Sequence, residues 1–134
     1  MTFAILGLVV YALVIAALIF ARRDVVLFLR EHPAITDQGS LETLKKLARR
    51  NMKAVLPMVA LFFAGMALTM QLMVLDLATA FVALLLANGL VAWSALVLSR
   101  TERHARELRC PDPELASEYR RVTKSWLSDL WPRF

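Results

Sequence analysis

The sequence has few of the residues that build chemical sites or tight turns. Its 134 residues include one cysteine, two histidines, four glycines and five prolines. A single cysteine cannot form a disulfide within the chain, which fits a reducing compartment. A closed metal site needs more ligands than one cysteine and two histidines supply at any recognised spacing. We therefore expect no metal and no cofactor.

The motifs of catalysis and of ion-coupled transport are also missing. The sequence contains no phosphate-binding loop, no nucleophile elbow and no paired carboxylates, so we expect no enzymatic activity. Proton-coupled carriers need ionisable residues within the membrane interior, and the apolar blocks of this chain have none there. A secondary transporter is therefore not expected.

What the chain has in excess is apolar sequence, since 59% of its residues are hydrophobic. Residues 3–21 carry no charge, and residues 54–99 carry only Asp76. The first block has the length of one membrane crossing, about 20 residues, and the second has room for two crossings joined by a turn. We predict an all-α integral membrane protein, a single membrane domain of residues 1–134, with transmembrane helices at 3–21, 54–73 and 77–99.

The basic residues indicate how these helices are oriented. Eight of the sixteen lysines and arginines lie in residues 22–53 and the other eight in residues 100–134. Positively charged segments stay on the cytoplasmic side of a membrane. The N-terminus should therefore lie outside and the C-terminus inside, and the most suitable location is a bacterial inner membrane.

The first cytoplasmic segment, residues 22–53, should contain an amphipathic basic helix. We expect the first span to project as a helix to about Glu31, ahead of Pro33, and a second helix to begin with Ser40 as its N-cap. The basic face of this second helix consists of Lys45, Lys46, Arg49, Arg50 and Lys53. This face would contact anionic lipid headgroups, or would serve only to fix the topology. Nucleic acid is not an expected partner, because no reading fold accompanies the charges.

The tail, residues 100–134, should form a second cytoplasmic amphipathic helix. We expect the third span to continue to Cys110, and a new helix to begin with Asp112 as its N-cap and Pro113 in its first turn. Trp126 and Trp131 suggest that this helix lies at the headgroup layer. The alternative is that it docks on the helix at residues 40–53.

Polar and small residues within the spans suggest helix packing. Asp76 is expected at the tip of the hairpin, where it would cap the third span, with a cation or proton site as the alternative. Rows of small or polar residues at helical spacing would let a partner helix approach closely, and they consist of Ala12, Ala16, Ala60, Ala64, Asn88, Ala92 and Ala95. These rows predict a homo-oligomer or a partner membrane protein.

Two families share part of this pattern. In its outside N-terminus, three crossings and charged inner tail, the chain resembles three-span phage holins, although its segment 22–53 is longer than theirs. In its basic loop and following hairpin, the chain is similar to the membrane glutathione transferase and eicosanoid family. Arg50 and Asn51 resemble the arginine and asparagine motif of that family. It departs from that family at Lys53 and Ala54, where an acidic residue would be needed, and in lacking a fourth span. The chain is assigned to neither family.

Three functions follow, in order of preference. The first is a small accessory or assembly protein that packs on partner helices and presents a basic cytoplasmic surface at the membrane. The second is a homo-oligomeric, holin-like pore lined by the row that contains Asn88. The third is a small membrane enzyme of the glutathione-transferase type, which would lose activity in Arg50→Ala.

Overall fold

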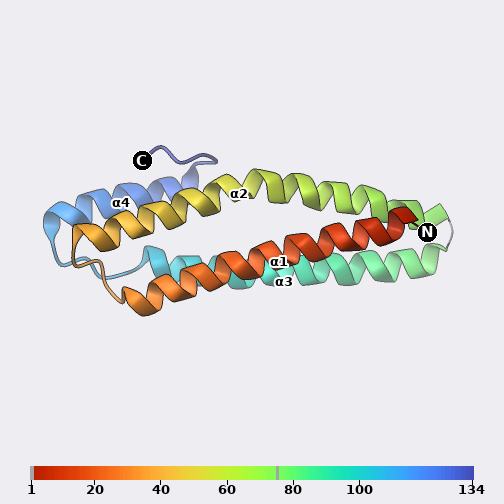
Figure 1. Ribbon diagram of the computed structural model, residues 1–134, viewed down its shortest axis with the longest axis horizontal. Helices are drawn as coiled ribbons and strands as arrows, with labels where there is room; N and C mark the ends of the chain where they lie inside the picture. The colour runs from red at the N-terminus through yellow and green to blue at the C-terminus, as the bar shows by residue number, and fades with distance from the viewer. Residues whose placement is uncertain (1, 75) are drawn as a thin grey trace. The chain divides into compact units, whose positions relative to one another are not determined.

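The described part of the chain is helical throughout its regular structure. A computed structural model describes residues 2–74 and 76–134, and Figure 1 labels the helices. They are α1 (Thr2–Glu31), α2 (Gln38–Met70), a short 3₁₀ helix η1 (Gln71–Val74), α3 (Leu77–Arg106) and α4 (Pro113–Ser128). Three of them, α1, α2 and α3, are long and apolar enough to cross a membrane. The prediction of an all-helical chain with three candidate spans is therefore confirmed at the level of length and composition.

The chain divides into two compact units, which we name by their composition. The apolar unit comprises Met1–Phe20 and Pro57–Leu98, and the charged unit comprises Ala21–Leu56 and Ser99–Phe134. Each of the three long helices contributes residues to both units. Asp76 is the only acidic or basic residue in the sequence of the apolar unit, whereas all sixteen lysines and arginines belong to the charged unit.

Close contact between α1 and α2 organises the apolar unit. Gly7 of α1 faces Gly65 and Thr69 of α2, and a methyl group at Gly7 would lie 2.5 Å from the Thr69 hydroxyl oxygen. The Tyr11 ring meets the Phe62 ring edge to face, with 5.8 Å between their centres. Gly7 and Gly65 let α1 and α2 approach closely, as is usual for helices packed in a membrane.

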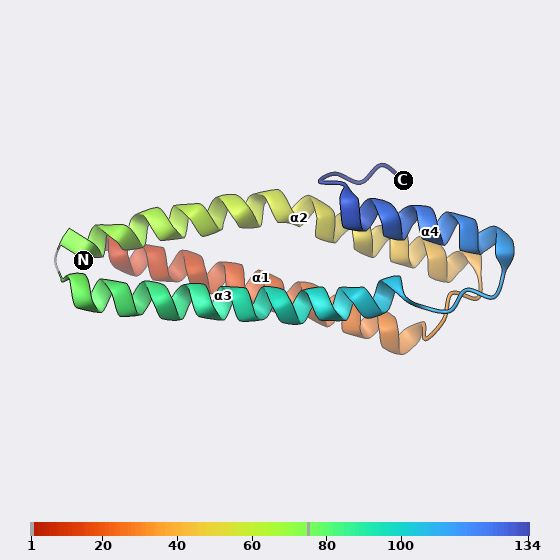
Figure 2. The same ribbon diagram turned by 180° about the vertical axis from the view of Figure 1, so that it is seen from behind.

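The charged unit has an apolar core of its own, formed by the ends of α1 and α3, the first half of α2, and α4. Helix α4 lies beside the first half of α2 (Figure 2). The Tyr119 hydroxyl donates a hydrogen bond to the Ala105 carbonyl and accepts one from the Leu108 amide, both at 2.9 Å. The side chains that fill the core are Val25, Phe28, Ile35, Leu41, Leu44, Leu47, Met52, Val122 and Trp126. Burial of these apolar side chains stabilises the packing of these helices against one another.

Two predicted helix boundaries are wrong. The cap of α2 is Asp37 and not Ser40: the Asp37 carboxylate accepts a hydrogen bond from the Ser40 amide at 2.8 Å, and the Ser40 hydroxyl lies 3.4 Å from the Asp37 amide. Ser40 therefore occupies the third helical position of a reciprocal capping box. Helix α3 ends at Arg106 and not at Cys110, and beyond its end the Arg109 carbonyl accepts a hydrogen bond from the Ile35 amide at 2.8 Å.

The predicted C-terminal end of α1 and the predicted start of α4 are confirmed. Helix α1 ends at Glu31, two residues before Pro33. Helix α4 begins after Asp112, whose carboxylate accepts a hydrogen bond from the Glu114 amide at 2.9 Å, with Pro113 in the first turn. Asp112 and Pro113 define the start of α4, and Pro33, which disfavours helical backbone at the residue before it, accounts for the end of α1.

Candidate functional site

A cleft in the charged unit lies between the end of α1 and the beginning of α2. Its volume is about 390 Å³. Helix α1 contributes Asp24, Leu27, Phe28 and Glu31. Helix α2 contributes Thr43, Lys46, Leu47 and Arg50. Both sets follow the spacing i, i+3, i+4, i+7, which places four residues on one face of a helix.

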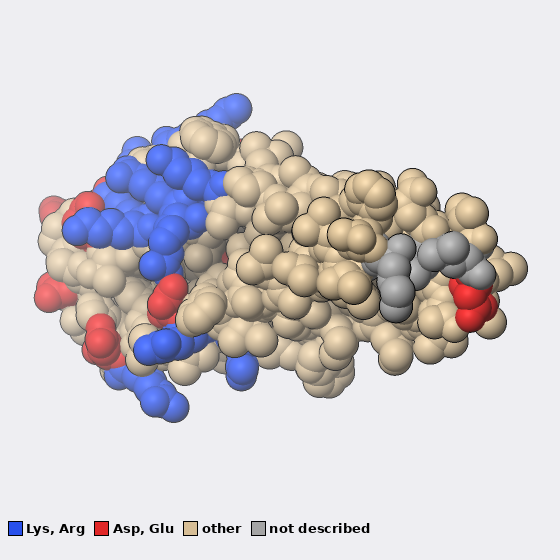
Figure 3. All heavy atoms as spheres, turned by 45° about the vertical axis from the view of Figure 1, so that its right-hand side comes forward, with Lys and Arg blue, Asp and Glu red and all other residues tan. Residues whose placement is uncertain are grey.

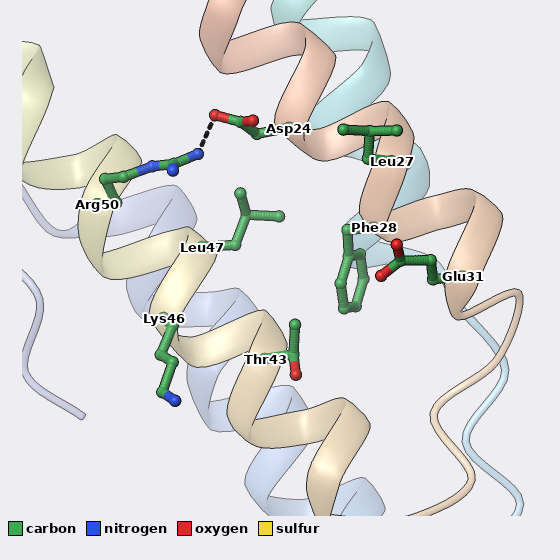
Figure 4. A pocket seen from close by; sticks show the side chains of 8 residues that line it. All are labelled: Asp24, Leu27, Phe28, Glu31, Thr43, Lys46, Leu47 and Arg50. Carbon is green, nitrogen blue, oxygen red and sulfur yellow. Dashed lines mark hydrogen bonds and ion pairs between the residues drawn. The ribbon is translucent and has the colours of Figure 1, made fainter.

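The two walls of the cleft carry opposite charges around an apolar centre. Both acidic residues are on α1 and both basic residues are on α2, with leucines and a phenylalanine between them (Figure 4). At one end the Arg50 guanidinium forms an ion pair with Asp24. Glu31 and Lys46 form no ion pair with any residue that the structure describes. One end of the cleft is thus closed by an ion pair, and the other offers one free charge of each sign.

An aromatic pair supports the α1 wall. The Phe28 and His32 rings are stacked with 5.1 Å between their centres and 26° between their planes. One face of Phe28 is therefore occupied, while the residue remains part of the cleft lining. Stacking of this kind holds the ring at a defined angle.

Lys45 does not belong to the exposed basic face that the sequence predicts. Its side chain is buried and forms ion pairs with Glu42, at 2.8 Å, and with Glu118 of α4. The Lys45 ammonium, as a hydrogen-bond donor, holds the pKa of the Glu118 carboxyl below its usual value. Lys45 connects α2 to α4, and its role is structural.

The other four basic residues of this face are exposed. Lys46 lines the cleft and Arg50 pairs with Asp24. The Arg49 guanidinium donates a hydrogen bond to the Phe134 carbonyl at 2.8 Å from Nε, and Lys53 Nζ lies 5.7 Å from the centre of the Trp131 ring. In Figure 3 the lysines and arginines form a dense cluster on the surface. Arginine and lysine beside aromatic rings are typical of a surface at the lipid headgroups.

The two tryptophans of the tail have different environments. Trp126 is 8% exposed and packs in the core, with the Arg106 guanidinium 5.9 Å from its ring centre. Trp131 is 53% exposed, as is expected of a lipid-facing residue. Trp126 is therefore buried within the charged unit, where the Lys45–Glu118 ion pair joins α4 to the first half of α2, and its contact with lipid stays a prediction.

Asn51 forms a polar contact that joins α2 to α3. Its side-chain amide donates a hydrogen bond to the Glu102 carboxylate at 2.9 Å, and Asn51 is buried. Arg50 and Asn51 therefore have separate partners, Asp24 and Glu102. The two neighbouring side chains do not converge on one site.

Most residues of the predicted small-residue rows are exposed and not buried within the apolar unit. Ala12 is exposed and Ala16 is half-buried in α1, and the other four alanines, Ala60, Ala64, Ala92 and Ala95, are exposed. Asn88 is half-buried, and its amide donates to the Leu84 carbonyl of its own helix at 2.7 Å. The close contact between α1 and α2 is formed instead by Gly7 and Gly65, which do not belong to the predicted rows. The spacing of small residues shows that a helix has a packing face, but not which neighbour occupies it.

Asp76 directly precedes the first residue of α3 and is exposed. Its carboxylate accepts hydrogen bonds from the Ala78 amide at 3.0 Å and from the Thr79 hydroxyl at 2.5 Å. The Thr79 hydroxyl and amide lower the pKa of this carboxyl, and they favour its ionised form. This geometry is that of a helix cap. The neighbouring position 75 of the expected hairpin turn is outside the described residues.

The acidic wall of the cleft, formed by Asp24 and Glu31, was not predicted from the sequence. The available signal was the spacing of two acids and two apolar residues on one helical face, matched by Thr43, Lys46, Leu47 and Arg50 on the next helix. Within residues 2–74 and 76–134, no group of three or more histidine, cysteine, aspartate or glutamate side chains could hold a metal ion. Comparison with protein-family models, curated proteins and solved structures found no match.

Proposed function

We propose that this chain is a small integral membrane protein of accessory or assembly type. Its three spans would pack against the helices of a partner membrane protein, and its charged unit would present a basic, aromatic surface to anionic lipid headgroups. The segregation of all sixteen lysines and arginines to the charged unit supports an outside N-terminus and an inside C-terminus. We further propose a bacterial inner membrane as its location.

One observation carries the proposal of a partner helix. Ala60 and Ala64 on α2, and Ala92 and Ala95 on α3, are exposed in the apolar unit. At most 17% of the residues in the most apolar stretch of each long helix are buried by the rest of the chain. Small residues allow helix backbones to approach closely, so these outward rows are suited to a second protein.

The charged unit supports contact with lipid. Arg49 and Lys53 are exposed beside Phe134 and Trp131, and Leu130 is 75% exposed. At a membrane surface each such cation contributes on the order of 1 kcal/mol, and exposed tryptophan and leucine enter the headgroup layer. Helices α2 and α4 would then act as the two cytoplasmic amphipathic helices of the membrane-bound protein.

Site-specific photocrosslinking in native membranes tests the proposal. A photoreactive residue at Ala64 or at Ala92 should form an adduct with a different protein, and the same residue at the buried Leu84 should not. Adducts between copies of this chain, together with dye leakage from vesicles, would instead support the homo-oligomeric pore. Failure of both outward positions to crosslink any protein would contradict the accessory function.

A further inference from the structure

We propose that the cleft between α1 and α2 binds the headgroup of a zwitterionic, amine-bearing phospholipid of the phosphoethanolamine class. The phosphate would lie between Lys46 and Arg50, and the ammonium would pair with Glu31. The inference rests on the proposed placement of the charged unit at the membrane surface, and it adds a specific lipid to a surface otherwise suited to anionic headgroups.

The position of the cleft along the helices points to a lipid. Asp24 lies three residues after the apolar block that ends at residue 21, and Arg50 lies four residues before the block that begins at residue 54. At about 1.5 Å per helical residue, the closed end of the cleft is about 5–6 Å beyond each block. The headgroup layer on each side of a bilayer is about 5–8 Å thick, so this end of the cleft lies within it. Glu31 is ten residues beyond its block and Lys46 is eight, so the open end of the cleft lies about 12–15 Å beyond the blocks, on the aqueous side of this layer.

The charges of the cleft favour a zwitterion over an anion. Lys46 and Arg50 are four residues apart on one face of α2, and Arg50 is turned toward Asp24 (Figure 4). A phosphate bound by both cations requires the Lys46 side chain to turn toward Arg50. On the opposite wall Asp24 and Glu31 would repel an anionic headgroup but would attract an ammonium group. Because Asp24 and Arg50 already pair with each other, the lining leaves one free charge of each sign, on Lys46 and on Glu31, and a ligand with one charge of each sign matches them.

The lining also distinguishes a primary amine from a quaternary one. A carboxylate accepts hydrogen bonds, and a primary ammonium has three donors, whereas trimethylammonium has none. Quaternary ammonium groups are instead recognised by aromatic faces. Phe28 is the aromatic residue of the cleft lining, and its ring is already stacked on His32. Glu31, whose carboxylate points into the gap between the helices in Figure 4, is the better partner.

Native mass spectrometry of the full chain released from mixed bilayers tests this inference. The bilayers contain phosphatidylethanolamine, phosphatidylglycerol and phosphatidylcholine in equal amounts. We expect phosphatidylethanolamine to be retained in preference to phosphatidylcholine, while phosphatidylglycerol binds the basic surface outside the cleft. Loss of one charge-assisted hydrogen bond in Glu31→Gln or in Lys46→Gln should weaken its retention about tenfold.

The matched control is Lys124→Gln, which removes an exposed lysine of α4 outside the cleft and should leave retention unchanged. Two cleft variants are used because each removes a side chain without an ion-pair partner, so at least one should remain folded, as circular dichroism will show. Retention of phosphatidylethanolamine no greater than that of phosphatidylcholine, or unchanged retention of phosphatidylethanolamine by a folded cleft variant, would overturn the inference. The measurement needs no protein partner, so its failure is separate from a failure of photocrosslinking.

Discussion

At the scale of single residues, the molecule depends on a few positions where the size of a side chain decides the packing. Gly7 is the clearest case, because a methyl group there would also lie 3.0 Å from the Thr69 backbone nitrogen and 3.2 Å from the Gly65 carbonyl oxygen. The backbone of α2 cannot move away as a flexible side chain could. We therefore expect Gly7→Ala to destabilise the apolar unit by about 1–3 kcal/mol, measured by thermal unfolding in detergent micelles.

Gly89 provides the matched control. A methyl group at this helical glycine would meet nothing within 4 Å. Gly89→Ala should leave stability unchanged or raise it by about 0.5–1 kcal/mol, because alanine favours the helix. Equal melting temperatures for Gly7→Ala and Gly89→Ala would contradict the close contact between α1 and α2.

At the scale of elements, the docking of α4 on α2 is the contact that shapes the charged unit. Trp126 is buried there, whereas Trp131 is exposed. Trp126→Ala should cost about 3–5 kcal/mol and should expose α4 to trypsin, measured as faster cleavage after Arg120 and Lys124. Trp131→Ala should leave cleavage unchanged in micelles. If the two variants are cleaved at the same rate, α4 is not held by Trp126.

The same docking should depend on pH through Glu118. Because Lys45 holds the folded-state pKa of Glu118 below its ordinary value of 4.5, this carboxylate stabilises the folded state fully above pH 4.5. That contribution is lost as pH falls through the lower, folded-state pKa. The stability of the parent chain should therefore exceed that of Glu118→Gln at pH 7, and the difference should shrink in acid.

To measure the effect, each variant is incubated at a series of pH values across this range. The unfolding of α4 is then monitored as its cleavage in short pulses of trypsin. Ser117→Ala is the control, because Ser117 is an exposed neighbour that carries no charge. A difference between Glu118→Gln and the parent chain that is constant with pH would show that the ion pair with Lys45 does not stabilise the docking.

At the scale of the whole molecule, the testable property is topology. With Cys110 replaced by serine, single cysteines at Thr2 and at Val74 should react with an impermeant thiol reagent added outside the cell. A cysteine at Lys124 should react only after the membrane is opened. Thr2, Val74 and Lys124 are exposed, so protection of any of them reports the membrane and not burial in the protein. Outside labelling at Lys124 would contradict the orientation inferred from the basic residues.

The sequence by itself determined the features that depend on local chemistry. The three apolar helices follow from the hydropathy of their residues, and the start of α4 follows from Asp112 and Pro113, whose groups act within one turn. The candidate site was predicted in part: four basic residues of the α2 face are exposed, but Lys45 is not. That difference could not be predicted, because it depends on Glu118, 73 residues away in the chain.

Only the tertiary structure decided which helix faces meet. The contact between Gly7 and Gly65, the burial of Trp126 and the cleft between α1 and α2 all depend on how two helices are rotated and shifted against one another. Several apolar or small faces of each helix would satisfy the hydropathy pattern equally well. The choice among them is made by steric fit and by paired charges between distant segments, which no local pattern of residues contains.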